Sequence, residues 1–262
     1  MVTSLVKDLF CNKHQEERHM NRLSNKFFVL STILALSHCG LFEPNTGVTD
    51  SYTFFSSSIR TLSSVIVYTP DPYDSDTPVI YLLNGWGADA NAWGSGMDLA
   101  HEAQERKIVF VSLTAGANTY TNDPLQQDEN YEDYVLEVVS KTEQEYDIDI
   151  GYEQRALCGI SNGGGGALFI LSEHPDSFIA CGSLSGTRYS SLSNYANLVD
   201  RGIRIDVGTT DGVLNQLRWL RDKLDEENVE HEYYEHAGKH DWDFWGKYAP
   251  KQFDFLETFI KD

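Results

Sequence analysis

The sequence predicts an α/β protein with a doubly wound, mostly parallel sheet. Short apolar runs rich in β-branched residues recur along the chain, as expected of strands buried on both faces of a parallel sheet. Between several of these runs, apolar residues recur three and four positions apart, which is typical of helices that cover a sheet. At 262 residues and 41% hydrophobic content, the chain is long enough for one domain with a sizeable core.

Seven strands follow from the apolar runs. The segment 70–78, rich in proline and aspartate, separates the first two runs as a turn would. In such a sheet, functional groups gather in the loops after the carboxyl ends of the strands. The predicted strands are 62–68, 79–83, 108–113, 155–159, 179–184, 203–207 and 232–235.

Three helices are predicted from apolar stripes, each expected to face the sheet. The third is the closing helix of the chain and is predicted over 250–260. The stripes consist of Tyr131, Tyr134, Val135, Val138 and Val139, then of Val213, Leu214, Leu217, Leu220 and Leu224, and last of Phe253, Leu256, Phe259 and Ile260.

The first 39 residues are predicted to be an export signal. Arg22 and Lys26 precede the apolar run 27–36, which is too short to span a bilayer, and cleavage after Ser37 fits the small-residue rule. The polar stretch before Met20 does not fit the charged start of a signal. Translation from Met20 therefore stays an alternative, as does a buried helix over 27–36.

The same segment also allows a second interpretation, in which the protein carries a lipid anchor. Leu36-Ser37-His38-Cys39 resembles a bacterial lipoprotein cleavage box in which Cys39 would be lipidated, although His38 stands where such boxes prefer a small residue. We expect an exported protein, whether periplasmic, held at the cell surface or secreted. Residues 40–50 are then a short linker, and residues 51–262 are the main domain.

The net charge limits the classes of binding partner, and the cysteine content indicates whether disulfides are expected. A formal net charge of −20 means that nucleic acid and anionic membrane surfaces should repel the protein. After export, Cys39, Cys158 and Cys181 would remain, an odd set that predicts no disulfide framework. Cys158 and Cys181 are expected to be buried thiols.

The strongest motif is Gly159-Ile160-Ser161-Asn162-Gly163, which matches Gly-x-Ser-x-Gly between a predicted strand and a helix. In such a nucleophile elbow the turn is so tight that side chains at Gly159 and Gly163 would collide with their neighbours. The alternatives are a glycine-rich turn with Ser161 as an ordinary helix cap, and a phosphate loop. No lysine follows the glycines, which disfavours the phosphate loop.

A serine nucleophile needs a base and an acid that orients the base. His240 follows the last predicted strand, and Asp211 opens the loop after the strand 203–207. Asp206 lies inside that strand and is expected to point into a sheet face. The chain order Ser161, Asp211, His240 is the serine, acid, histidine order of the fold in which the nucleophile elbow occurs.

The other histidines are less well placed. His231 and His236 lie at or beside the last strand. His236 and His240 have the spacing of a helical metal pair, but Gly238 and the strand pattern argue against a helix there, so no metal site is predicted.

Catalysis also needs donors for the developing oxyanion. The backbone N–H of Asn162, just after the nucleophile, is one candidate. The second is the N–H of Trp86, because Asn84-Gly85-Trp86-Gly87 is predicted to form a tight turn after the strand 79–83.

Three segments resemble the esterase D group of the α/β-hydrolases, which includes feruloyl esterases, S-formylglutathione hydrolases and mycolyltransferases. They are Tyr81-Leu82-Leu83-Asn84-Gly85-Trp86-Gly87, Gly159-Ile160-Ser161-Asn162-Gly163-Gly164 and Gly238-Lys239-His240-Asp241-Trp242. The resemblance covers residues 51–262 and implies an α/β-hydrolase catalytic domain. It also implies triad roles for Ser161, Asp211 and His240, with Trp86 and Asn162 as oxyanion donors, and Glu132 matches a recurrent acidic position.

Two departures from that group concern the pocket. Asn84 stands where many relatives have histidine, which is expected to alter the pocket wall. The connection from Gly186 to Ile203 is too short for a large cap domain, so an open, shallow pocket is expected. Six aromatic residues are candidates to line it, although for each of them packing is the stronger expectation: Trp86, Trp93, Tyr120, Tyr189, Trp242 and Trp245.

The expected function is hydrolysis of carboxylic esters through an acyl-Ser161 intermediate, without cofactor or metal. Export and the resemblance favour acyl or feruloyl esters of carbohydrates as substrates. Three alternatives stay open: a thioesterase like S-formylglutathione hydrolase, an acyltransferase, and a glycan-binding surface protein without catalysis on a hydrolase fold.

Overall fold

The computed structural model describes residues 46–114, 116–123, 125, 128–187, 189 and 192–261. The predicted signal segment, including Met20 and Cys39, lies outside the described residues. Among the described helices there is no candidate for a membrane span.

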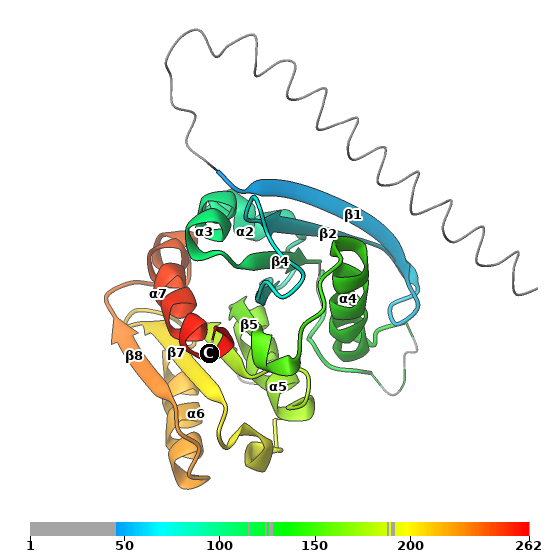
Figure 1. Ribbon diagram of the computed structural model, residues 1–262. Helices are drawn as coiled ribbons and strands as arrows, with labels where there is room; N and C mark the ends of the chain where they lie inside the picture. Colours follow the sequence, from blue (N-terminus) through cyan, green and yellow to red (C-terminus); the bar gives the residue numbers. More distant parts are fainter. Residues whose placement is uncertain are drawn as a thin grey trace, which may run out of the picture. The chain divides into compact units, whose positions relative to one another are not determined.

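One eight-stranded sheet, in the order β1-β2-β4-β3-β5-β6-β7-β8, forms the centre of the fold (Figure 1). The six strands from β4 to β8 in this order run parallel, whereas β1 and β2 pair antiparallel at one edge. The strands are β1 Val48–Ser56, β2 Thr61–Thr69, β3 Val79–Leu83, β4 Val109–Leu113, β5 Arg155–Ile160, β6 Ala180–Leu184, β7 Gly202–Gly208 and β8 Glu232–His236. The seven predicted strands are confirmed, with ends that differ by no more than one residue.

Strand β1 was not predicted. It is an edge strand that pairs only with β2, and most of its residues are exposed. Asp50 and Ser51 interrupt the apolar pattern, while Tyr52 and Phe54 alone pack against the core. The strand begins at Val48, so the boundary predicted between linker and domain after residue 50 lies inside it. An edge strand needs no continuous apolar run, which explains the missed signal.

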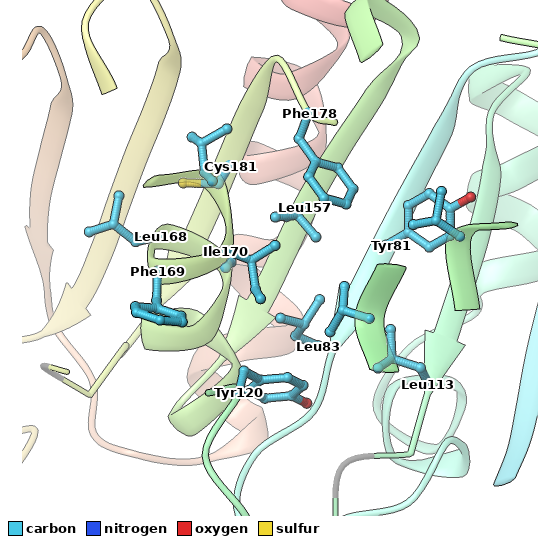
Figure 2. Packing of buried hydrophobic residues seen from close by; sticks show 14 of the residues in the cluster. Tyr81, Leu83, Leu113, Tyr120, Leu157, Leu168, Phe169, Ile170, Phe178 and Cys181 are labelled. Atoms are coloured by element: carbon cyan, nitrogen blue, oxygen red, sulfur yellow. The ribbon is translucent and has the colours of Figure 1, made fainter. Parts of the chain in front are cut away.

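Helices cover both faces of the sheet, as the doubly wound prediction requires. The side chains of β3, β4 and β5 alternate between two apolar layers. The first layer is covered by α4 Tyr131–Tyr146, α5 Asn162–Glu173 and α6 Leu214–Glu226, and Figure 2 shows Phe169 and Ile170 of α5 within it. The second is covered by α2 Asn91–Gly96, α3 Leu99–Arg106 and α7 Trp242–Ile260. Two 3₁₀ helices complete the described elements, η1 Tyr152–Gln154 and η2 Tyr195–Leu198.

The closing helix is longer than predicted. We expected it over 250–260, but α7 begins at Trp242 and contains Pro250 in its interior. Proline is usually unfavourable there because it lacks an N–H donor and crowds the preceding turn. Phe244, Trp245 and Ala249 are buried upstream of Pro250, so burial of the apolar stripe outweighs this local preference.

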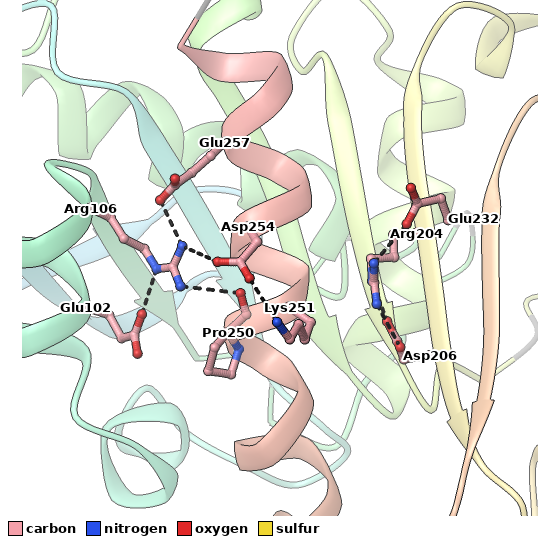
Figure 3. A network of polar contacts seen from close by, with 9 residues as sticks. All are labelled: Glu102, Arg106, Arg204, Asp206, Glu232, Pro250, Lys251, Asp254 and Glu257. Carbon is pink, nitrogen blue, oxygen red and sulfur yellow. Dashed lines mark hydrogen bonds and ion pairs between the residues drawn. The ribbon is translucent and has the colours of Figure 1, made fainter.

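Arg106 ties α3 to α7 (Figure 3). Its guanidinium donates to Glu102 at 2.6 Å, and to Asp254 and Glu257 at 2.9 Å each. It also donates to the carbonyl oxygen of Pro250 at 3.4 Å. A planar guanidinium with five donors suits such a cluster of acceptors, so Arg106 joins the two helices on the second face.

Candidate active site

Ser161 lies at the turn between β5 and α5 with φ 53° and ψ −120°, a positive-φ conformation that is rare outside glycine. Cβ atoms at Gly159 and Gly163 would overlap the carbonyl of Gly163 and that of Leu83, respectively. The Ser161 N–H donates to the carbonyl oxygen of Leu184, the last residue of β6, at 2.9 Å. The glycines therefore permit the tight turn that projects Ser161 beyond the sheet edge, as predicted.

The structure brings Ser161, His240 and Asp211 together. His240 Nε2 lies 2.8 Å from Ser161 Oγ, and His240 Nδ1 lies 3.0 Å from each carboxylate oxygen of Asp211. Because a carboxylate accepts, Nδ1 carries the hydrogen and the lone pair of Nε2 faces the serine hydroxyl. This is the tautomer that can remove the proton of a serine hydroxyl.

A backbone donor fixes the orientation of Asp211, and packing fixes that of His240. Asp211 is 6% exposed and also accepts the N–H of Val213 at 2.9 Å. The His240 ring lies edge-on to Trp245, with centroids 5.0 Å apart. About a third of the His240 side chain remains exposed, at 34%, and Ser161 is half-buried, so the pair is open to solvent.

The other two histidine candidates are engaged elsewhere. His236 is bonded to Asp206 at 2.7 Å and stacks on Tyr248, while His231 is bonded to the carbonyl of Val229. His236 and His240 therefore pair with different aspartates. Within the described ranges no group of three or more potential metal ligands occurs.

The two predicted oxyanion donors belong to segments that lie next to Ser161. Asn162 is the first residue of α5, where N–H groups have no acceptor within the helix. Gly85 to Ala88 form a β-turn closed by the Ala88 N–H and the Gly85 carbonyl, with Gly87 at φ 76°. The N–H of Gly87 donates to the carbonyl oxygen of Gly116. Neither this hydrogen bond nor the one that closes the turn uses the N–H of Trp86. A Cβ on Gly85 would lie 3.5 Å from Ser161 Cβ, which places this turn directly beside the serine.

Two residues singled out in the sequence lie elsewhere than in the pocket wall. Asn84 is fully buried, and its Nδ2 donates to the carbonyl of Leu113 at 2.7 Å, so the expectation that it alters the wall is wrong. Glu132 bonds His174 at 2.9 Å. His174 follows the last turn of α5, at the opposite end of that helix from Ser161.

Of the six aromatic candidates, most pack in the interior. Trp93 and Tyr120 are fully buried, and Tyr189 and Trp245 are 8% exposed each. Trp86, which follows Gly85 in the turn beside the serine, is 61% exposed and is therefore accessible to a substrate. Sequence reasoning missed that Tyr189 bonds Asn162 and accepts the N–H of Tyr120. The run of four glycines after Asn162 was the signal that could have pointed to close packing there.

The sheet order, the two helical layers and the serine at the strand-to-helix turn define an α/β-hydrolase fold, and the described residues form no large cap domain. In the described part of the connection from Gly186 to Gly202, η2 is the only helix.

Residues 56–253 match the model of the Esterase family, and the chain belongs to that family. It is 23% identical over 255 residues to an acetyl esterase of Caldicellulosiruptor saccharolyticus, in an alignment that covers 78% of this chain and 96% of that protein.

Solved structures of esterases share the fold. A ferulic acid esterase superimposes with a TM-score of 0.73 and 19% identity, covering 82% of this chain and 99% of its own. An S-formylglutathione hydrolase from Staphylococcus aureus superimposes with a TM-score of 0.69 and 17% identity, covering 80% of this chain and 98% of its own.

Proposed function

We propose that this esterase hydrolyses carboxylic esters through an acyl-Ser161 intermediate. The observation that carries the proposal is the continuous set of contacts from Ser161 Oγ through the His240 ring to Asp211, at 2.8 and 3.0 Å. Membership of the Esterase family supports the reaction class.

In the first half-reaction, His240 Nε2 takes the proton of Ser161 as Oγ bonds to the carbonyl carbon. The carbonyl oxygen becomes an oxyanion that accepts the N–H groups of Trp86 and Asn162. The tetrahedral intermediate then collapses, and the alcohol leaves with the proton from His240. In the second half, His240 deprotonates water, which attacks the acyl group and releases the acid with Ser161 restored. Asp211 stabilises the imidazolium in both halves.

For the substrate, we propose acyl or feruloyl esters of carbohydrates. The support is the similarity to proteins named acetyl esterase and ferulic acid esterase, together with the predicted export signal. The exposed side chain of Trp86, on the turn beside the serine, suits an acyl or sugar ring that lies on the surface. Chromatography of products released from acetylated and feruloylated xylan tests this assignment. Turnover of S-formylglutathione alone would replace it with the thioesterase alternative.

The reaction itself is tested with short-chain p-nitrophenyl esters. The wild-type chain should release nitrophenol with an initial burst that corresponds to acylation, and Ser161→Ala should lose at least about 10³-fold in kcat. Ser177, a serine in the turn after α5, provides a control variant, Ser177→Ala, that should keep full activity. Equal turnover by Ser161→Ala and wild type would refute the serine mechanism. No turnover by the wild type on any ester, with retained binding of glycans, would favour the binding-protein alternative.

A further inference from the structure

Four consecutive glycines, residues 163–166, follow Asn162 at the start of α5, and the elbow requires only the first of them. Glycine is unfavourable inside helices, so the other three call for a local cause. Space supplies it, because a Cβ on each would overlap a neighbour. The obstructions are Gly186 and Ser183 for Gly164, Thr187 and Tyr189 for Gly165, and the ring of Tyr120 for Gly166.

Tyr189 lies against the start of α5 and holds Asn162. Its hydroxyl is 2.8 Å from Asn162 Oδ1 and 3.1 Å from the Asn162 carbonyl oxygen, and donates toward both. The same hydroxyl accepts the backbone N–H of Tyr120 at 3.1 Å. Asn162 Nδ2 donates to the carbonyl of Asn118 at 2.8 Å. The residue that follows the nucleophile is thus fixed from two sides by side-chain contacts.

Tyr120 carries the connection to the other donor. Its hydroxyl donates to the carbonyl oxygen of Asn84 at 3.0 Å, and Figure 2 shows its ring between α5 and the end of β3 at Leu83. Asn84 is itself anchored through Nδ2 to Leu113 and precedes Gly85 and Trp86 directly. A continuous chain of contacts therefore runs from Asn84 through Tyr120 and Tyr189 to Asn162.

We propose that Tyr120 and Tyr189 are positioning residues that brace the two oxyanion donors, Trp86 N–H and Asn162 N–H, at the separation the tetrahedral intermediate requires. The proposal rests on the proposed function, because it assigns the brace to that same site. The two donors come from different elements, the turn after β3 and the start of α5. Backbone donors act on the oxyanion only when they are held at hydrogen-bond distance from its position.

Both phenols stay protonated at the pH values at which an esterase works. Burial raises the pKa of Tyr189 and of Tyr120 above the ordinary value for tyrosine. Each hydroxyl therefore remains a donor, and the brace should act equally across the pH range of activity.

The test uses Tyr120→Phe and Tyr189→Phe in the full chain, since both changes keep the ring that packs on the glycines. We expect each variant to lose about 10-fold in kcat on p-nitrophenyl acetate, less than the ~10²–10³ of a removed donor, with KM changed by less than about 3-fold. The double variant should lose little more than the worse single one, because both hydroxyls belong to one chain of contacts.

Tyr134→Phe is the matched control. Tyr134 is a fully buried tyrosine of α4 whose hydroxyl bonds Ser63 of β2, outside the chain of contacts around Asn162. The same change there should leave kcat unaltered. Thermal unfolding of each variant separates loss of stability from loss of catalysis.

Unchanged kcat in both variants, or a loss confined to KM, would overturn the brace while leaving the serine mechanism intact. Equal losses in Tyr134→Phe would assign the effect to general stability and also overturn it. Absence of turnover in the wild type, or turnover that survives Ser161→Ala, would refute the proposed function and the brace with it.

Discussion

Two aspartates near the end of β7 each bond a histidine, and their surroundings differ. Asp206 is fully buried and is bonded by Arg204 at 2.8 Å, by Gln252 at 2.7 Å and by His236. Figure 3 shows its ion pair with Arg204. Asp211 is bonded by His240 and by one backbone N–H. Because Arg204 compensates the charge of Asp206, we assign Asp206 to stability. Within the described part of the chain, Asp211 has no such partner and is available to stabilise the imidazolium of His240.

We expect the same substitution, aspartate to asparagine, to have different effects at the two positions. Asp211→Asn should lower kcat by about 10³–10⁴-fold with a small change in unfolding temperature, because an amide can hold His240 in the wrong tautomer. Asp206→Asn should lower the free energy of unfolding by about 3 kcal/mol, because Arg204 then keeps only the partly exposed Glu232 as a counter-charge. Steady-state kinetics and denaturant unfolding of both variants check this. A large loss of kcat per folded molecule in Asp206→Asn alone would reverse the assignment.

At the scale of elements, Glu137 joins α4 to the turn between β1 and β2. Its carboxylate accepts Ser56 Oγ at 2.6 Å, and Ser57 N and Ser57 Oγ at 3.0 Å. The N–H of Ser58 reaches it at 3.4 Å. The exposed edge hairpin, which gains little from burial, is thereby tied to the helix that covers the first apolar layer.

The pH dependence of stability follows from the same carboxylate. Burial opposes its ionisation, but hydrogen bonds from the three serines outweigh burial and hold the pKa of Glu137 below its ordinary value. A lowered pKa means stability that is present above the unfolded pKa and lost as pH falls through the folded pKa. Glu137→Gln should cost about 1 kcal/mol near pH 7, and the difference from wild type should shrink below about pH 4. Urea unfolding at both pH values measures it, and a pH-independent difference would contradict this account.

At the scale of the whole molecule, the two apolar layers on either side of one sheet hold the described residues together as one folded unit. We propose that the preceding residues serve export. The net charge of −20 gives the protein no electrostatic attraction to anionic membrane surfaces.

Cell fractionation tests export in a bacterial host. The full chain should reach the periplasm or the medium, and a chain without residues 20–38 should stay in the cytosol. If Cys39 is the anchored residue, Cys39→Ser should move activity from the membrane fraction to the soluble fraction, and palmitate labelling should disappear. Full-length protein in the cytosol, without cleavage, would contradict export and favour an intracellular thioesterase.

Much of this protein is determined by its sequence alone. The apolar runs located seven strands, because strands buried on both faces must be apolar throughout. Gly159, Ser161 and Gly163 indicated the elbow, because a turn this tight excludes side chains at two fixed positions. The loops after β7 and β8 supplied Asp211 and His240, because parallel strands deliver their carboxyl ends to one edge.

Only the tertiary structure decided the edge strand, the start of the closing helix and the contacts between distant residues. Edge strand β1 and the first turns of α7 have weak local patterns, and pairing with β2 or packing in the second apolar layer determines them. Asn84, Tyr120 and Tyr189 are far apart in the chain, and no spacing rule predicts that they form one chain of hydrogen bonds that ends at Asn162. Local sequence determines which residues can form an element, whereas contacts between distant segments are decided when the whole chain packs.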